Sequence, residues 1–187
     1  MGAVGGIIYK QMKDAQQAEQ YYEDLSRTVK LTKNQRQTLE EYKIQSGELA
    51  AGLRDSRITE KDYRVKDIDA AIKKSRLSDN VVVYRALPLN ALGVSNPTDA
   101  VGKTIADKSY FSTTLNPRTM QKFLNAQTNG VGIIVRAKAG TPALSMSTIQ
   151  SKMGTSEQEV LFGRNTKIKI TGTKDIGGKT YLIADMK

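Results

Sequence analysis

Apolar residues spaced three and four positions apart predict helices over the first part of the chain, to about residue 76. The first helix is expected over 9–30, and the second at the capping box Thr32-Lys33-Asn34-Gln35. A third helix is expected to be capped by Ser46, and a fourth to begin at Thr59 or Asp62. The polypeptide is therefore predicted to begin as a group of packed helices.

β-Branched residues and alternating patterns take over at Val81 and predict strands for the rest of the chain. The expected strands cover 81–85, 110–114, 131–137, 143–144, 159–163, 166–173 and 179–185. Proline and glycine make 88–102 a loop, and Asn116-Pro117 predicts a turn or short helix through Leu124. Gly177-Gly178 predicts a hairpin turn. Helices followed by strands predict an α+β fold with a mostly antiparallel sheet.

The 187-residue chain contains no cysteine and no histidine, which excludes several kinds of chemistry. A cysteine nucleophile, a disulfide framework, a Cys/His zinc site and a Ser-His-Asp triad all require one of these residues. Catalysis must therefore depend on carboxylates, Lys, Arg, Tyr, Ser or Thr. The length suits one domain whose core is large enough to fold without metal or disulfides.

The net charge of +10 indicates an anionic partner, which could be nucleic acid, an anionic membrane or a dinucleotide. A solvated basic surface explains the charge equally well. Aromatic residues make up only 6% and tryptophan is absent, which argues against a base-stacking platform. Lys and Arg are scattered instead of forming one block, so a non-catalytic nucleic-acid-binding module is the weaker alternative. No segment is long and apolar enough to span a membrane.

Polar residues interrupt otherwise apolar strands at three places, and such local conflicts mark candidate functional sites. The interruptions are Arg85, Ser112-Thr113-Thr114 and Glu157-Gln158-Glu159. Arg136 interrupts a further strand in the same way. Each has an ordinary interpretation: a salt bridge for either arginine, common strand residues for Ser and Thr, and a solvated pair for the glutamates.

The chemical alternative gives each of these residues a role in binding or catalysis. The planar guanidinium of Arg85 suits a phosphate group. Side chains alternate along a strand, so Glu157 and Glu159 are expected to project from one face. Two such close carboxylates repel unless a cation lies near them, and a guanidinium substrate would supply one. A carboxylate beside a ribose can also stabilise an oxocarbenium-like transition state.

The ordered set of Arg85, Ser112-Thr113-Thr114 and Glu157-Gln158-Glu159 resembles the bacterial ADP-ribosyltransferase exoenzymes of the Arg / Ser-Thr-Ser / Glu-X-Glu group. This family includes the C3-like Rho-modifying enzymes and the catalytic halves of the actin-modifying binary toxins. The resemblance covers about 31–185 and includes the dipeptide Leu53-Arg54.

The resemblance implies an α+β fold with N-terminal helices packed on a mixed, mostly antiparallel β core of two sheets. It makes residues 1–30 a helical extension and residues 31–187 a single catalytic domain. Many members of the family carry an aromatic residue three positions before the first glutamate, where this chain has Gly154. The resemblance therefore does not name the target protein.

Each residue that matches the family's motif receives a role from the resemblance. Glu159 is expected to be the catalytic glutamate, and Ser112 the serine that holds it by a hydrogen bond. Glu157 matches the position where glutamate accompanies transfer to arginine and glutamine accompanies transfer to asparagine. Phe123 is expected to be the aromatic residue of the nicotinamide loop. The residues expected to bind the cofactor NAD are Arg85, Thr113, Thr114, Arg136, Phe123 and Arg54.

The implied activity is mono-ADP-ribosylation of a protein arginine with NAD as a substrate. No metal is expected, because nicotinamide is already a cationic leaving group. The expected partners are NAD, a target protein with an acceptor arginine, and an immunity or delivery protein, while nucleic acid is not expected. The protein is expected to be secreted or injected as a toxin or effector without a classical signal peptide, and to act in the cytosol. An NAD glycohydrolase on the same fold is the other alternative.

Overall fold

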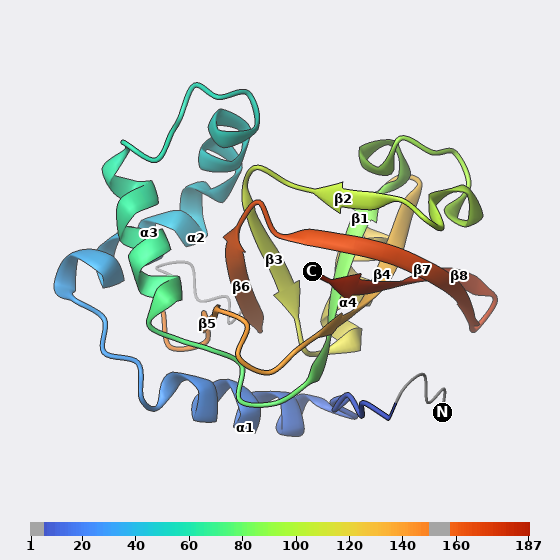
Figure 1. Ribbon diagram of the computed structural model, residues 1–187, viewed down its shortest axis with the longest axis horizontal. Helices are drawn as coiled ribbons and strands as arrows, with labels where there is room; N and C mark the ends of the chain where they lie inside the picture. The colour runs from blue at the N-terminus through green and yellow to red at the C-terminus, as the bar shows by residue number, and fades with distance from the viewer. Residues whose placement is uncertain (1–5, 150–157) are drawn as a thin grey trace.

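The computed structural model describes residues 6–149 and 158–187, and Figure 1 shows a twisted sheet with helices beside one end, along one edge and behind the strands. The helices are α1 (Ala15–Ser26), α2 (Lys33–Arg54), α3 (Tyr63–Lys73) and α4 (Pro117–Asn125), with the short 3-10 helices η1 (Leu89–Leu92) and η2 (Pro97–Ala100). The strands are β1 (Val81–Pro88), β2 (Thr104–Ala106), β3 (Tyr110–Thr114), β4 (Gly130–Ala137), β5 (Ala143–Ser145), β6 (Glu159–Arg164), β7 (Lys167–Ile176) and β8 (Lys179–Met186). The α+β class predicted from the sequence is confirmed.

Side-chain caps define where the helices begin. The predicted capping box is present, because the Gln35 backbone N–H donates to the Thr32 hydroxyl at 3.1 Å and the Thr32 N–H donates to the Gln35 side chain at 3.0 Å. Helix α3 was expected to begin at Thr59 or Asp62. In the structure Asp62 is its N-cap, and the Asp62 carboxylate accepts from the Arg64 N–H at 2.8 Å. The helix expected to be capped by Ser46 is present in part. Gln45 has non-helical φ and ψ angles of −119° and 23°, so two helical segments meet in a kink there, one residue before the predicted cap. The second segment continues directly from the first within α2 and is not a separate helix.

All eight strands form one sheet in the order β2-β7-β8-β4-β1-β3-β6-β5. Strands β4 and β8 are parallel and the other neighbours are antiparallel, so the mixed, mostly antiparallel core is confirmed. The expected division into two sheets is not confirmed. The two groups of strands are instead continuous through the contact of β1 with β3, where the register consists of the pair Tyr84 and Thr114.

Alternating side chains place helices on both faces of this sheet. Val81 and Val83 of β1 join an apolar cluster with α1, whereas Val82 and Tyr84 join a cluster with α4 on the opposite face. A third cluster lies between β5–β6 and the pair α2–α3. Residues of α1 such as Tyr22 therefore belong to the same buried core as the strands.

Three strands differ clearly from the sequence-based expectation. Strands β1 and β7 continue to Pro88 and Ile176, each three residues past its expected end, and β2 was not predicted at all. The hairpin turn is confirmed, since Gly177 and Gly178 both have positive φ angles, 57° and 76°. Within residues 6–149 and 158–187, no helix has the length and apolar character needed to cross a membrane.

Candidate active site

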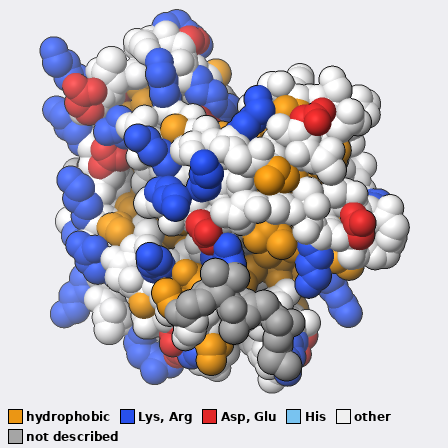
Figure 2. Space-filling model, turned by 45° about the vertical axis from the view of Figure 1, so that its right-hand side comes forward, with side chains coloured by type: hydrophobic (Ala, Val, Ile, Leu, Met, Phe, Trp, Pro, Cys, Tyr) orange, Lys and Arg blue, Asp and Glu red, His pale blue; other side chains and the backbone are white. Residues whose placement is uncertain are grey.

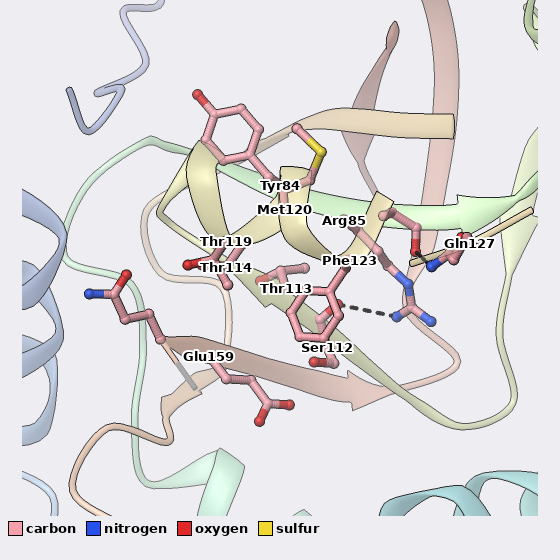
Figure 3. A pocket seen from close by; sticks show the side chains of 12 residues that line it. Tyr84, Arg85, Ser112, Thr113, Thr114, Thr119, Met120, Phe123, Gln127 and Glu159 are labelled. Atoms are coloured by element: carbon pink, nitrogen blue, oxygen red, sulfur yellow. Dashed lines mark hydrogen bonds between the residues drawn. The ribbon is translucent and has the colours of Figure 1, made fainter. Parts of the chain in front are cut away.

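A cavity of about 190 Å³ opens where β1 meets β3, at the narrow junction between the two groups of strands. Its walls come from β1, β3, α4 and the start of β6 (Figure 3). The lining residues are Tyr84, Arg85, Ala86, Ser112, Thr113, Thr114, Thr119, Met120, Phe123, Gln127, Gln158 and Glu159. The fold thus brings together residues from all three motifs that the sequence singled out.

Arg85 lies inside β1 and not at its end, because that strand continues to Pro88. Its side chain is only 13% exposed, and its guanidinium lies 4.5 Å from the centre of the Phe111 ring. One guanidinium nitrogen donates to the backbone carbonyl of Ser112 at 3.3 Å, the dashed line in Figure 3. Burial lowers the pKa of Arg85, yet an arginine stays protonated at neutral pH. A fixed positive charge therefore lines the cavity.

Asp107 connects this arginine to Arg54 at the end of α2. Both carboxylate oxygens accept from Arg54, at 3.0 and 2.7 Å, and one of them lies 3.7 Å from the Arg85 guanidinium. The carboxylate also accepts from the backbone N–H of Ser109 at 2.9 Å. Burial opposes ionisation, but the hydrogen bonds from Arg54 and Ser109 hold the pKa of Asp107 below its usual value. Two cations therefore share one anion beside the cavity.

The Ser112-Thr113-Thr114 segment forms the C-terminal end of β3. The Thr113 hydroxyl donates to the backbone carbonyl of Val160 at 2.9 Å and so ties β3 to β6. The Thr114 hydroxyl accepts from the Asn116 backbone N–H at 3.1 Å, where α4 begins. Both threonine hydroxyls thus fix the backbone around the cavity, which the Ser112 side chain also lines (Figure 3).

Glu159 is the first residue of β6 and pairs with Thr114 across the strands. It is 8% exposed, which is rare for a carboxylate, and it faces the same space as Ser112 and Phe123 in Figure 3. It supplies the carboxylate in the wall of a cavity that also holds the Arg85 guanidinium. Glu157 and Gly154 lie outside the described residues.

Comparison with known sequences identifies this arrangement. Residues 14–187 match the family described as ADP-ribosyltransferase exoenzyme. The chain belongs to this family. The match covers nearly the whole chain and begins at Asp14, the N-cap of α1. No curated protein sequence matches the chain.

Solved structures show the same fold at low sequence identity. The Clostridium limosum C3 exoenzyme is similar with a TM-score of 0.81 at 17% identity, over 96% of this chain and 98% of that chain. C3stau2 from S. aureus, solved with NAD, has a TM-score of 0.79 at 20% identity, with the same coverage of 96% and 98%. The ADP-ribosylating toxin BECa of a C. perfringens binary enterotoxin, solved with NADH, has a TM-score of 0.72 at 19% identity, over 95% of this chain and 49% of that chain.

Phe123 of this exoenzyme lies on α4 and not on a loop, which corrects the sequence-based expectation. Its side chain is 48% exposed and projects over the mouth of the cavity beside Met120. An aromatic face at that position is available to stack on a flat ring.

Arg136 is not brought to the cavity. It donates to the Asp185 carboxylate at 2.6 Å, beside β8. It pairs with Val82 on β1, three residues before Arg85, and it is not among the residues that line the cavity. The expected contact of Arg136 with NAD phosphate therefore has no support in the geometry of the exoenzyme.

Several residues around the site carried no signal in the sequence. Asp107 follows a strand that was not predicted, and Gln127 follows α4 in a polar stretch. Asn116 was read only as a turn residue, yet its side-chain amide donates to the Gln158 side chain at 2.7 Å. Tyr22 resembled a core residue on a helix, but its hydroxyl accepts from the Leu115 N–H at 2.9 Å. Among the residues that the structure describes, no group of three or more acidic side chains is placed to hold a metal ion.

Proposed function

We propose that this exoenzyme cleaves NAD and transfers ADP-ribose to an arginine of a target protein, as a secreted or injected toxin or effector. The observation that carries the proposal is the buried Glu159 carboxylate in one cavity with Arg85 and Ser112. A negative charge and a positive charge at opposite walls fit a substrate that has an anionic pyrophosphate and develops a cationic ribose.

The charges at the cavity set the orientation of NAD. Arg85 would bind the pyrophosphate, with Arg54 joined to it through Asp107. The nicotinamide and its ribose would enter the cavity beneath Phe123, which brings the reacting carbon close to Glu159. Two of the similar structures were solved with NAD or NADH, which supports this choice of substrate.

Glu159 would act on the bond that joins ribose C1′ to the nicotinamide nitrogen. That bond breaks with its electron pair staying on nicotinamide, which leaves as a neutral molecule. Positive charge then develops on the ribose, and a carboxylate in a largely buried site stabilises it strongly. Ser112, beside Glu159 at the cavity wall, fits the expected role of holding that carboxylate.

The acceptor half of the reaction rests on the sequence motif. A guanidino nitrogen of the target arginine attacks ribose C1′ and forms the new bond. A free guanidinium does not lose a proton near neutral pH, so the proton leaves only as the attacking nitrogen becomes less basic. Glu157 would orient the arginine and take this proton.

Isotope-labelled NAD tests the proposal directly. Cell lysate incubated with the purified chain should gain ADP-ribose on protein, and mass spectrometry should locate it on arginine. Glu159→Gln should lower nicotinamide release at least about a thousandfold, because it removes the charge that stabilises the transition state. Near-normal turnover in this variant would reject the assignment. Glu157→Gln is the matched variant and should keep nicotinamide release while losing transfer.

Other outcomes of the same experiment distinguish the alternatives. Free ADP-ribose without labelled protein would identify an NAD glycohydrolase. Absence of any NAD turnover, together with salt-dependent DNA binding, would identify a nucleic-acid-binding module. On the face drawn in Figure 2, Lys and Arg side chains lie mainly over its left half, with a few Asp and Glu side chains among them.

A further inference from the structure

The hydroxyl group of Tyr22 lies between strands β3 and β6, at the point where their pairing ends. Strands β3 and β6 are antiparallel, and their last pair is Thr114 with Glu159. One residue further on, the same register places Leu115 opposite Gln158. In a continued ladder these two residues would be joined by their own backbone groups.

A side chain from α1 makes this connection instead. The Leu115 N–H donates to the Tyr22 hydroxyl at 2.9 Å, and the hydroxyl donates to the Gln158 backbone carbonyl. The Thr114 hydroxyl lies 3.4 Å from the same oxygen. One phenol oxygen therefore spans the gap between the strands and sets their separation where β6 begins.

The bridge is buried and consists of a neutral donor. Tyr22 is 1% exposed, and burial raises the pKa of its hydroxyl far above the usual value, with the nearby charge of Glu159 adding to the rise. The hydroxyl is therefore protonated at neutral pH and can donate. Without it, a backbone N–H and a backbone carbonyl would lose their partner in the interior.

We propose that Tyr22 is a positioning residue for Glu159, acting through the backbone of Gln158. This inference rests on the proposed function of Glu159 in NAD cleavage. Glu159 follows Gln158 directly, so a shift of the held carbonyl rotates the backbone from which the carboxylate projects. Asn116 holds the Gln158 side chain at 2.7 Å, which leaves the Tyr22 hydroxyl as the group that fixes its carbonyl. Helix α1 is on this basis part of the catalytic apparatus.

The substitution Tyr22→Phe removes the hydroxyl and keeps the buried ring. We expect kcat for nicotinamide release to fall about tenfold to a hundredfold while KM for NAD changes less than about twofold, because a displaced reacting group slows chemistry more than binding. The assay uses the full chain over a range of NAD concentrations, at a temperature where circular dichroism shows the variant to be folded. A purely structural role would lower the melting temperature and leave kcat unchanged.

Tyr21→Phe is the matched control on the neighbouring position of the same helix. Tyr21 is also buried, but its hydroxyl accepts from the Ser78 hydroxyl at 3.3 Å, a residue that does not line the cavity. Its kcat should stay within about twofold of the wild-type value. An unchanged kcat in folded Tyr22→Phe, or an equal fall in both variants, would overturn the proposal. A wild-type chain that releases no nicotinamide would instead refute the proposed function itself.

Tyr22→p-aminophenylalanine tests the proposal even if the phenylalanine variant does not fold. Its amino group keeps the shape of tyrosine and can donate to the Gln158 carbonyl, so most of the wild-type kcat should return. A folded amino variant that is as slow as the phenylalanine variant would contradict the inference. If the phenylalanine variant does not fold, a loss of more than about tenfold in the folded amino variant would contradict it as well.

Discussion

At the scale of single residues, the site is organised by groups that are themselves held in place. Arg85 and Glu159 were predictable because a charge in an apolar strand conflicts with its surroundings. Asp107 and Tyr22 were not, because an aspartate in a loop and a tyrosine on a helix match their local patterns. Their roles depend on partners that are distant in sequence. Sequence reasoning therefore identified Arg85 and Glu159 at the cavity but missed Asp107 and Tyr22, which contact the strands around them.

Asp107 leads to a prediction about NAD affinity. In Asp107→Asn the side chain keeps its size, but Arg54 and Arg85 lose the anion that fixes their geometry. We expect KM for NAD to rise about tenfold, which corresponds to roughly 1.4 kcal/mol, close to the lower end of the range for a hydrogen bond to a charged group. Steady-state kinetics of nicotinamide release measure this change.

The matched control is Asp99→Asn, which makes the same substitution at an exposed position on η2. It should leave KM for NAD unchanged, because Asp99 does not line the cavity. A lower KM in Asp107→Asn would mean that the carboxylate competes with the NAD phosphates for the two arginines, the reverse of the role assigned here.

At the scale of elements, the sequence predicted helix starts, turns and strands correctly where neighbouring residues alone determine them. The capping box at Thr32, the hairpin glycines and most strands are confirmed. Strand β2 was missed because it is three residues long and exists through its pairing with β7 at the sheet edge. The helix boundary expected at Ser46 is present as a kink at Gln45 inside α2, and not as a gap between two separate helices.

Gly132 on β4 gives a prediction about packing between elements. A Cβ atom at this position would lie 2.5 Å from the Tyr181 ring and 2.9 Å from the Met120 sulfur, so α4 and β8 can approach only a glycine. Gly132→Ala should cost about 1–3 kcal/mol and lower the melting temperature by about 2–10 °C. Thermal denaturation followed by circular dichroism measures it.

Gly163→Ala on β6 is the comparison for this experiment. A Cβ at Gly163 meets nothing within 4 Å, and its φ is ordinary. This variant should melt within about 2 °C of the wild-type chain, as expected for a substitution without strain. Equal melting temperatures for both alanine variants would show that Tyr181 and Met120 can move enough to accept the added methyl group.

At the scale of the whole molecule, the cavity lies where the sheet is narrowest. Five strands from β2 to β1 and three strands from β3 to β5 meet at the pair of Tyr84 with Thr114. A ligand in this cavity touches both groups and should hold them together. The position of the site therefore links substrate binding to the stability of the complete fold.

NAD should accordingly raise the melting temperature. At a concentration of about one hundred times Kd, binding adds about 2.7 kcal/mol, equivalent to roughly 5–10 °C for a chain of this size. The measurement is best made on Glu159→Gln, in which NAD persists during heating. Arg85→Ala in the same background should show a much smaller rise. Equal rises would mean that NAD binds without the Arg85 guanidinium.

The bridge between Tyr22 and Gln158 joins positions 136 residues apart. A nascent chain leaving the ribosome cannot complete this contact until the strand with Glu159 has also been synthesised. Contacts between such distant positions form slowly, because closing a long loop costs conformational entropy. The site can therefore form only after the ribosome has synthesised the chain through β6. A chain threaded unfolded through a narrow pore would likewise be inert until it refolds on the far side.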